Sequence, residues 1–198
     1  MKSLPKYLPR VFFMAMLLIS VVCPGQKLSF GTKAGVIFSN ATIRDANAGD
    51  PDTRVTGRTG ITGGFFASMA LGQKAIFRPG IEIVSKGVRN NYNSNGASYG
   101  VPFTYVDVPL NVLYKINFSK GHLLVGGGPY IGFSVKDFYP IYPVKTDAGL
   151  NALTAYETSI GFSFNLNYSY GLSNASNNTD LYSKIMNRYF GITVGYLF

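Results

Sequence analysis

The sequence predicts an all-β fold, an eight-stranded antiparallel up-and-down transmembrane β-barrel. Three observations predict it. Eight segments of ten residues or more alternate apolar and polar side chains, which is the period of a β-strand. The connections between these segments alternate between long and short. Glycine is abundant, at 23 residues, and aromatic residues make up 15% of the chain, whereas charged residues make up only 14%, below the quarter or so that is usual in soluble domains.

The alternating segments are long enough to cross a bilayer. A tilted strand of about 9–11 residues spans the hydrocarbon core. In the seventh segment Phe162, Phe164 and Leu166 lie on one side, and Ser163 and Asn165 lie on the other. The sixth segment has the weakest alternation. In chain order the eight segments are residues 28–38, 60–71, 76–88, 105–116, 123–135, 147–156, 160–172 and 187–198.

The connections favour a barrel of the bacterial outer membrane. Long outer loops and short periplasmic turns are typical of these proteins. The connections after the first, third, fifth and seventh segments are long and polar, at residues 39–59, 89–104, 136–146 and 173–186. Those after the second, fourth and sixth segments are short, at residues 72–75, 117–122 and 157–159.

Side-chain size indicates which face of each strand meets lipid. In each segment, one set of alternate positions is apolar and the other is polar, and we call these sets the apolar and the polar parity. The apolar parity carries large residues with almost no charge, as contact with lipid requires. The polar parity is rich in glycine, including Gly126, Gly128 and Gly132, and small side chains suit the narrow interior of an eight-stranded barrel. The alternative is a soluble, lipocalin-like carrier whose apolar parity fills the interior.

The first 25 residues have the features of a signal peptide. Lys2, Lys6 and Arg10 form a basic region, and the apolar residues 11–22 that follow are too few to span a bilayer as a helix. We expect cleavage after Gly25, which leaves residues 26–198 as one outer-membrane β-barrel domain. The cleaved segment carries Cys23, the only cysteine, and the remainder has 15 basic and 9 acidic residues, a net charge of +6. The basic residues are spread along the chain, which argues against a nucleic-acid partner and leaves outer-membrane lipid as the expected surroundings.

The last segment alternates to the final residue. Phe198 follows Tyr196 and Val194 on the apolar parity. With an even number of strands the last strand pairs with the first, so no backbone edge faces lipid. A terminal phenylalanine in such a strand is similar to the assembly signal that the barrel-assembly machinery reads, so we expect Phe198 and Tyr196 to serve that purpose.

Several segments resemble a known family. FGTKAGVIFSN, FRPGIEIVSKGV, YVDVPLNVLYKI, GGGPYIGF, YSYGLSN and FGITVGYLF resemble the small outer-membrane β-barrel proteins of Bacteroidetes that are often called PorT-like. The resemblance covers residues 26–198. It implies an eight-stranded outer-membrane barrel, and it implies no single activity. Some members act in the type IX secretion and gliding apparatus, so a subunit of an envelope or secretion complex is one expected role.

The sequence offers no catalytic or metal site. His122 is the only histidine, and we expect it in a solvent-exposed turn without a catalytic partner. With one histidine, no cysteine after cleavage and no calcium-binding loop, the sequence lacks the ligands of a metal site. We therefore expect neither an enzyme nor a cofactor, and a barrel-type membrane hydrolase or acyltransferase is the less favoured alternative.

One polar cluster is predicted in the barrel interior. Charges enclosed there must pair or bind water, because removing an ion from water costs several kcal/mol. We expect an ion-paired plug that closes the lumen. The alternatives are a narrow channel for ions or small solutes, and a dyad in which Glu82 and Asp107 share a proton. The predicted cluster comprises Lys33, Arg78, Glu82, Lys86, Asp107, Asn111 and Lys115.

The predicted outer loops combine aromatic residues with asparagine and serine. Such loops on a rigid scaffold suit recognition of a protein or glycan partner. The alternative is that these aromatics belong to the girdle at the lipid headgroups. The residues concerned are Tyr92, Tyr99, Tyr139 and Tyr142.

Overall fold

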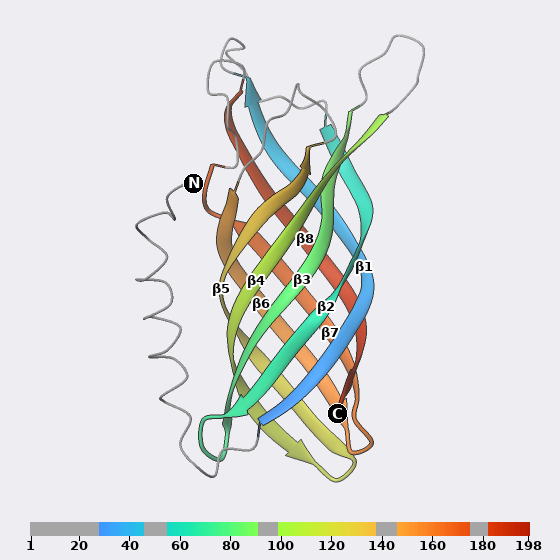
Figure 1. Ribbon diagram of the computed structural model, residues 1–198, viewed down its shortest axis with the longest axis vertical. Helices are drawn as coiled ribbons and strands as arrows, with labels where there is room; N and C mark the ends of the chain where they lie inside the picture. Colours follow the sequence, from blue (N-terminus) through green and yellow to red (C-terminus); the bar gives the residue numbers. More distant parts are fainter. Residues whose placement is uncertain (1–27, 46–54, 91–98, 138–145, 175–181) are drawn as a thin grey trace, which may run out of the picture.

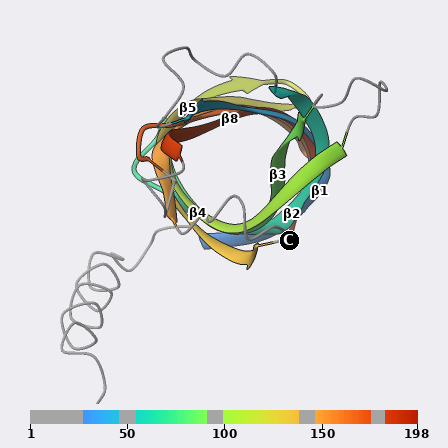
Figure 2. The same ribbon diagram turned by 90° about the horizontal axis from the view of Figure 1, so that it is seen from above.

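The computed structural model describes residues 28–45, 55–90, 99–137, 146–174 and 182–198. Within these ranges the chain forms eight antiparallel strands that close into a barrel, seen from the side in Figure 1 and as a ring in Figure 2. Each strand pairs with its neighbours in sequence, and the last pairs with the first. The predicted fold class is confirmed. The strands are β1 (Leu28–Asp45), β2 (Val55–Ala70), β3 (Ala75–Asn90), β4 (Tyr99–Phe118), β5 (Gly121–Asp137), β6 (Thr146–Thr158), β7 (Phe162–Gly171) and β8 (Tyr182–Leu197).

The apolar parity of the strands faces outward. β7 alternates between exposed and buried side chains at every residue. The exposed fractions of the outward-facing side chains of Phe65, Ile81 and Phe164 are 69%, 60% and 54%. A belt of large apolar side chains on the outside of a barrel is the surface that lipid requires. No helix in the described ranges has the length and apolar character needed to cross a membrane.

The strands differ from the predicted segments mainly at their ends. β1 continues to Asp45, and its ladder with β8 extends to the pair of Asp45 with Tyr182. β4 and β8 likewise begin earlier than predicted. Apolar alternation stops where a strand leaves the hydrocarbon, but backbone pairing continues, so the sequence pattern underestimates strand length. β7 instead begins two residues late, because Gly161 adopts a positive φ of 93° in the preceding turn.

The two ends of the barrel have different connections. The connections after β2, β4 and β6 contain only residues 71–74, 119–120 and 159–161. In bacterial outer-membrane barrels the short turns face the periplasm, so we call this the periplasmic end and the opposite one the outer end. The C-terminus lies at the periplasmic end (Figure 1). There the backbones of Phe198 and Phe30 exchange two hydrogen bonds, of 2.9 and 3.3 Å, which complete the seam between β8 and β1.

Candidate functional site: the barrel interior

The inward-facing parity brings charged and amide side chains together inside the barrel. In a narrow lumen, side chains from strands on opposite sides of the wall can meet. Three polar groups result, which we name by position. The periplasmic-side cluster comprises Ser68, Arg78, His122 and Glu157. The central pair comprises Lys33 and Glu82, and the outer-side cluster comprises Lys86, Asp107, Tyr130, Asp147 and Asn187.

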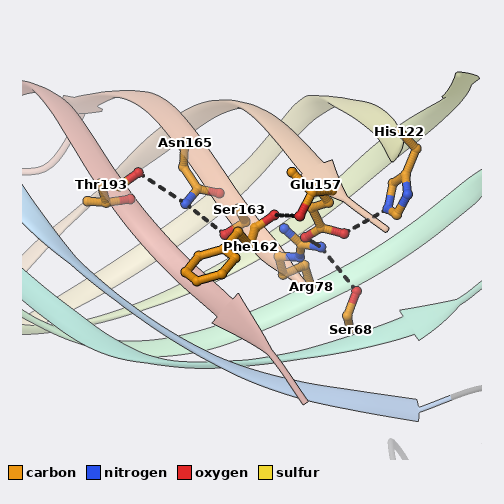
Figure 3. Close-up of polar contacts among 9 residues, drawn as sticks. Ser68, Arg78, His122, Glu157, Phe162, Ser163, Asn165 and Thr193 are labelled. Atoms are coloured by element: carbon orange, nitrogen blue, oxygen red, sulfur yellow. Dashed lines mark hydrogen bonds and ion pairs between the residues drawn. The ribbon is translucent and has the colours of Figure 1, made fainter. Parts of the chain in front are cut away.

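The periplasmic-side cluster is centred on Glu157. Arg78 Nη2 donates to Glu157 Oε1 at 2.5 Å and to Ser68 Oγ at 3.2 Å. The other carboxylate oxygen, Oε2, lies 2.7 Å from Nε2 of His122 (Figure 3). His122 and Glu157 are register partners on β5 and β6, which places both side chains on the same face. The Arg78 guanidinium also lies 4.7 Å from the ring centroid of Phe66, a cation–π distance. One buried carboxylate therefore joins β3, β5 and β6.

The central pair reaches across an intervening strand. Lys33 Nζ lies 2.7 Å from Glu82 Oε1, and both side chains are buried. Lys33 is paired in register with Gly64 of β2, and Gly64 is paired with Glu82 of β3. A Cβ at Gly64 would lie 2.2 Å from the carbonyl oxygen of Ile81. At this register position, no side chain of β2 stands between the lysine and its carboxylate.

The outer-side cluster surrounds a single buried ammonium. Lys86 Nζ lies 2.8 Å from Asp107 Oδ2 and 2.9 Å from Asp147 Oδ2. Tyr130 OH and Asn187 Nδ2 each donate to Asp147 Oδ2 at 3.2 Å. The cluster thus connects β3, β4, β5, β6 and β8. The ring centroids of Tyr105, Tyr130 and Tyr189 lie 4.7, 4.8 and 5.4 Å from Lys86 Nζ.

Amide and apolar side chains fill the space between these groups. Asn151 Nδ2 donates to Asn111 Oδ1 at 3.0 Å, and Ser169 Oγ donates to Asn151 Oδ1 at 3.0 Å. Asn165 Nδ2 donates to Ser163 Oγ at 3.2 Å (Figure 3). Two groups of buried apolar side chains also face inward. They are Ile76, Leu113, Leu124, Leu153 and Ala155, and Ile37, Val84 and Tyr189.

The ring of Figure 2 is therefore occupied by side chains. A cavity bounded by Lys33, Arg78, Glu82 and Asn111 has a volume of about 10 Å³. This is the lower limit for one water molecule, which needs roughly 10–15 Å³. The chemistry that this interior supports is ion pairing and hydrogen bonding between strands.

Six of the seven residues of the predicted lumen cluster are buried inside the barrel: Lys33, Arg78, Glu82, Lys86, Asp107 and Asn111. The seventh, Lys115, is half-buried at the periplasmic end. Glu82 and Asp107 are register partners, yet each is paired with its own lysine. The geometry therefore does not favour a proton shared between these two carboxylates.

The expectation for His122 was wrong. It lies in β5, faces inward and contacts Glu157, because β5 begins at Gly121. Sequence reasoning also missed Asp147 and Glu157, the carboxylates that bind Lys86 and Arg78. Asp147 shares the inward-facing alternation of Asn151 in the weakly alternating sixth segment, and Glu157 continues that alternation one residue beyond its predicted end. That shared parity is the signal that could have identified them.

Of the remaining candidate residues, Tyr99, Tyr196 and Phe198 fall within the described ranges. Tyr92, Tyr139 and Tyr142 lie outside the described residues, and Tyr99 begins β4 but its side chain is not described. Tyr196 faces outward, with its ring edge-on to Phe162 at a centroid separation of 5.4 Å. Phe198 is exposed beside the seam. In the part of the chain that the structure describes, no three His, Cys, Asp or Glu residues are grouped to hold a metal.

Comparison with known proteins gives one family and several similar folds. The family model described as "Outer membrane protein beta-barrel domain" matches residues 24–177. Neisserial surface protein A (NspA) has a TM-score of 0.53 at 12% sequence identity, with 87% of this chain and 99% of that chain covered. The outer membrane protein OprG from Pseudomonas aeruginosa has a TM-score of 0.55 at 13% identity, with 86% and 95% covered. At these identities the likeness concerns the fold alone. Curated protein sequences gave no match.

Proposed function

This chain belongs to the outer membrane protein beta-barrel domain family, and from that premise we propose that it is a plugged barrel with a structural or surface-interaction role. The observation that carries the proposal is the filled lumen. Buried ion pairs join β1 to β3 and β3 to β6, and the cavity among Lys33, Arg78, Glu82 and Asn111 is only about 10 Å³. A solute path would require these charged side chains to separate, at a cost of several kcal/mol for each ion left unpaired.

The proposal includes assembly and maturation. Residues 1–25 act as a signal peptide and are removed, on the evidence of their charge and apolar pattern. The barrel-assembly machinery then reads the strand that ends in Tyr196 and Phe198. The support for this step is that β8 closes the barrel against β1 and that both side chains face outward.

The finer assignment concerns partners. The chain serves as a PorT-like subunit of an envelope or secretion complex of Bacteroidetes, in keeping with the sequence segments that resemble that family. Its predicted outer loops, which contain Tyr92, Tyr99, Tyr139 and Tyr142, present a protein- or glycan-binding surface. Since the interior side chains are engaged with one another, no catalytic role is assigned to them.

Conductance measurement separates this role from that of a narrow channel. The folded protein is inserted into planar lipid bilayers, with a general porin as the positive control. We expect no stepwise current from the wild-type barrel. Reproducible current steps that Arg78→Ala alters would overturn the plug and identify a channel lined by the periplasmic-side cluster.

A further inference from the structure

A second cavity lies at the periplasmic mouth, beneath the plug. Its volume is about 170 Å³, far above the roughly 10–15 Å³ needed by one water. Its polar lining comes from five strands: Ser29 of β1, Ser68 of β2, Lys115 of β4, His122 of β5 and Glu157 of β6. All five have the inward parity of their strands, so the cavity is reached along the barrel axis.

The charge in this cavity is not balanced. Glu157 is almost fully buried, with one carboxylate oxygen bound to Arg78 and the other to His122. Lys115, by contrast, forms no ion pair within the described ranges, although it is half-buried. A partly desolvated ammonium without a counter-ion is a place where an anion is favoured. The negative charge of Glu157 does not offset the positive charge of Lys115, because the Arg78 guanidinium already neutralises the Glu157 carboxylate.

The turns beside the cavity carry the same sign of charge. The three periplasmic turns, residues 71–74, 119–120 and 159–161, contain Lys74 and Lys120 and no acidic residue. Lys115 follows the inward parity of Leu113, so its ammonium is directed into the mouth and away from the lipid headgroups around the barrel. An anion must therefore approach from the periplasm and not from the plane of the membrane.

We propose that the periplasmic mouth is a binding site for one small oxyanion group, a carboxylate or a phosphate. Lys115 supplies the charge, and the Ser29 hydroxyl and the His122 ring supply hydrogen-bonding groups. This proposal goes beyond the plugged barrel, because the cavity lies on the periplasmic side of the plug. A barrel that conducts ions would therefore neither support nor contradict the anion site, which the titration below tests separately.

The single histidine provides a direct reporter. The mature chain, labelled at histidine and purified without a histidine tag, is folded in detergent micelles. The His122 ring resonances are followed by NMR at fixed pH and ionic strength. Sodium acetate is titrated in one arm, and inorganic phosphate in the other. The arm that saturates at the lower concentration identifies a carboxylate or a phosphate as the preferred group.

Three variants test the role of Lys115. Lys115→Gln should weaken the apparent affinity by about tenfold or more, and Lys115→Arg should retain it. Arg188→Gln, which removes an exposed cation of β8 near the outer end of the barrel, should leave the affinity unchanged. A difference in SDS-gel mobility between boiled and unboiled samples establishes that each variant is folded. Shifts that fail to saturate with either anion in the wild-type protein overturn the proposal. Equal affinities in wild type and Lys115→Gln also overturn it. If Lys115→Gln does not fold, a loss of affinity in Ser29→Ala with none in Arg188→Gln decides in favour of the site.

Discussion

Glycine determines where charged side chains can meet inside this barrel. Gly132 of β5 is paired in register with Asp107 on one side and with Asp147 on the other. A Cβ at Gly132 would lie 2.3 Å from Asp107 Oδ1. The two carboxylates can approach the same ammonium, that of Lys86, because no side chain stands between them. Gly64 has the equivalent position between Lys33 and Glu82.

Lys86 should be the most sensitive of the buried cations, because one ammonium serves two carboxylates. We predict that Lys86→Met lowers the free energy of unfolding by about 3–5 kcal/mol, since it leaves Asp107 and Asp147 buried without a counter-ion. Urea-induced unfolding in lipid vesicles, followed by gel mobility, measures the change.

Two controls make the Lys86 result specific. Lys120→Met removes a lysine that is exposed in a periplasmic turn and should change stability by less than about 0.5 kcal/mol. The combined change Lys86→Met, Asp107→Asn and Asp147→Asn should recover much of the loss, because it leaves no unpaired charge. Wild-type stability in Lys86→Met alone would show that the outer-side cluster does not hold the barrel together.

At the level of single residues, the sequence predicted which side chains enter the interior better than it predicted their partners. Period-two alternation placed Lys33, Glu82 and Asp107 on the inward face, where the structure has them. The pairing of Arg78 with Glu157 joins residues 79 positions apart on strands that are not neighbours. Alternation carries no information on which strands face each other across a barrel, so this pairing could not be read from it.

Among the strands, alternation predicted the facing of each element and underestimated its length. Ile192 of β8 is paired with Val36 of β1 and Leu166 of β7, and all three side chains face outward. They lie within the apolar belt. The strand extensions toward Asp45 and Tyr182 lie beyond that belt and lack its apolar pattern. Strand ends are therefore set by backbone pairing, which composition does not reveal.

The depth of a strand position should determine how well it tolerates charge. We predict that Ile192→Arg destabilises the barrel by about 2–4 kcal/mol, as expected for an arginine facing lipid near the middle of the bilayer. Leu172→Arg, one residue beyond the outer end of β7, should cost only about 0–1 kcal/mol. Unfolding in vesicles of defined lipid composition measures both.

The comparison between the two arginine variants decides whether the outward face of β8 meets lipid. Equal, small effects at Ile192 and Leu172 would contradict an apolar belt that contacts the hydrocarbon core. A large loss of stability confined to Ile192→Arg would agree with the position of β8 between β7 and β1 in the closed wall.

For the whole molecule, closure of the sheet into a barrel and filling of its lumen by side chains act together. Pairing of β8 with β1 leaves no strand edge in the membrane, and the inward side chains of all eight strands then share one narrow interior. Lipid supports the outer surface, while ion pairs and amide hydrogen bonds connect the wall across the lumen. The central claim is that this interior is sealed to solutes.

Thiol labelling tests that claim most directly. Residues 26–198 contain no cysteine, so in a protein of these residues Ser169→Cys introduces a single thiol at a buried interior position. Ser119→Cys introduces one in an exposed periplasmic turn. A small membrane-impermeant thiol reagent is added to the folded proteins in detergent micelles, where both ends of the barrel are open to solvent. The account predicts rapid modification of Ser119→Cys, with Ser169→Cys modified only after unfolding. Rapid modification of Ser169→Cys in the folded barrel would contradict it.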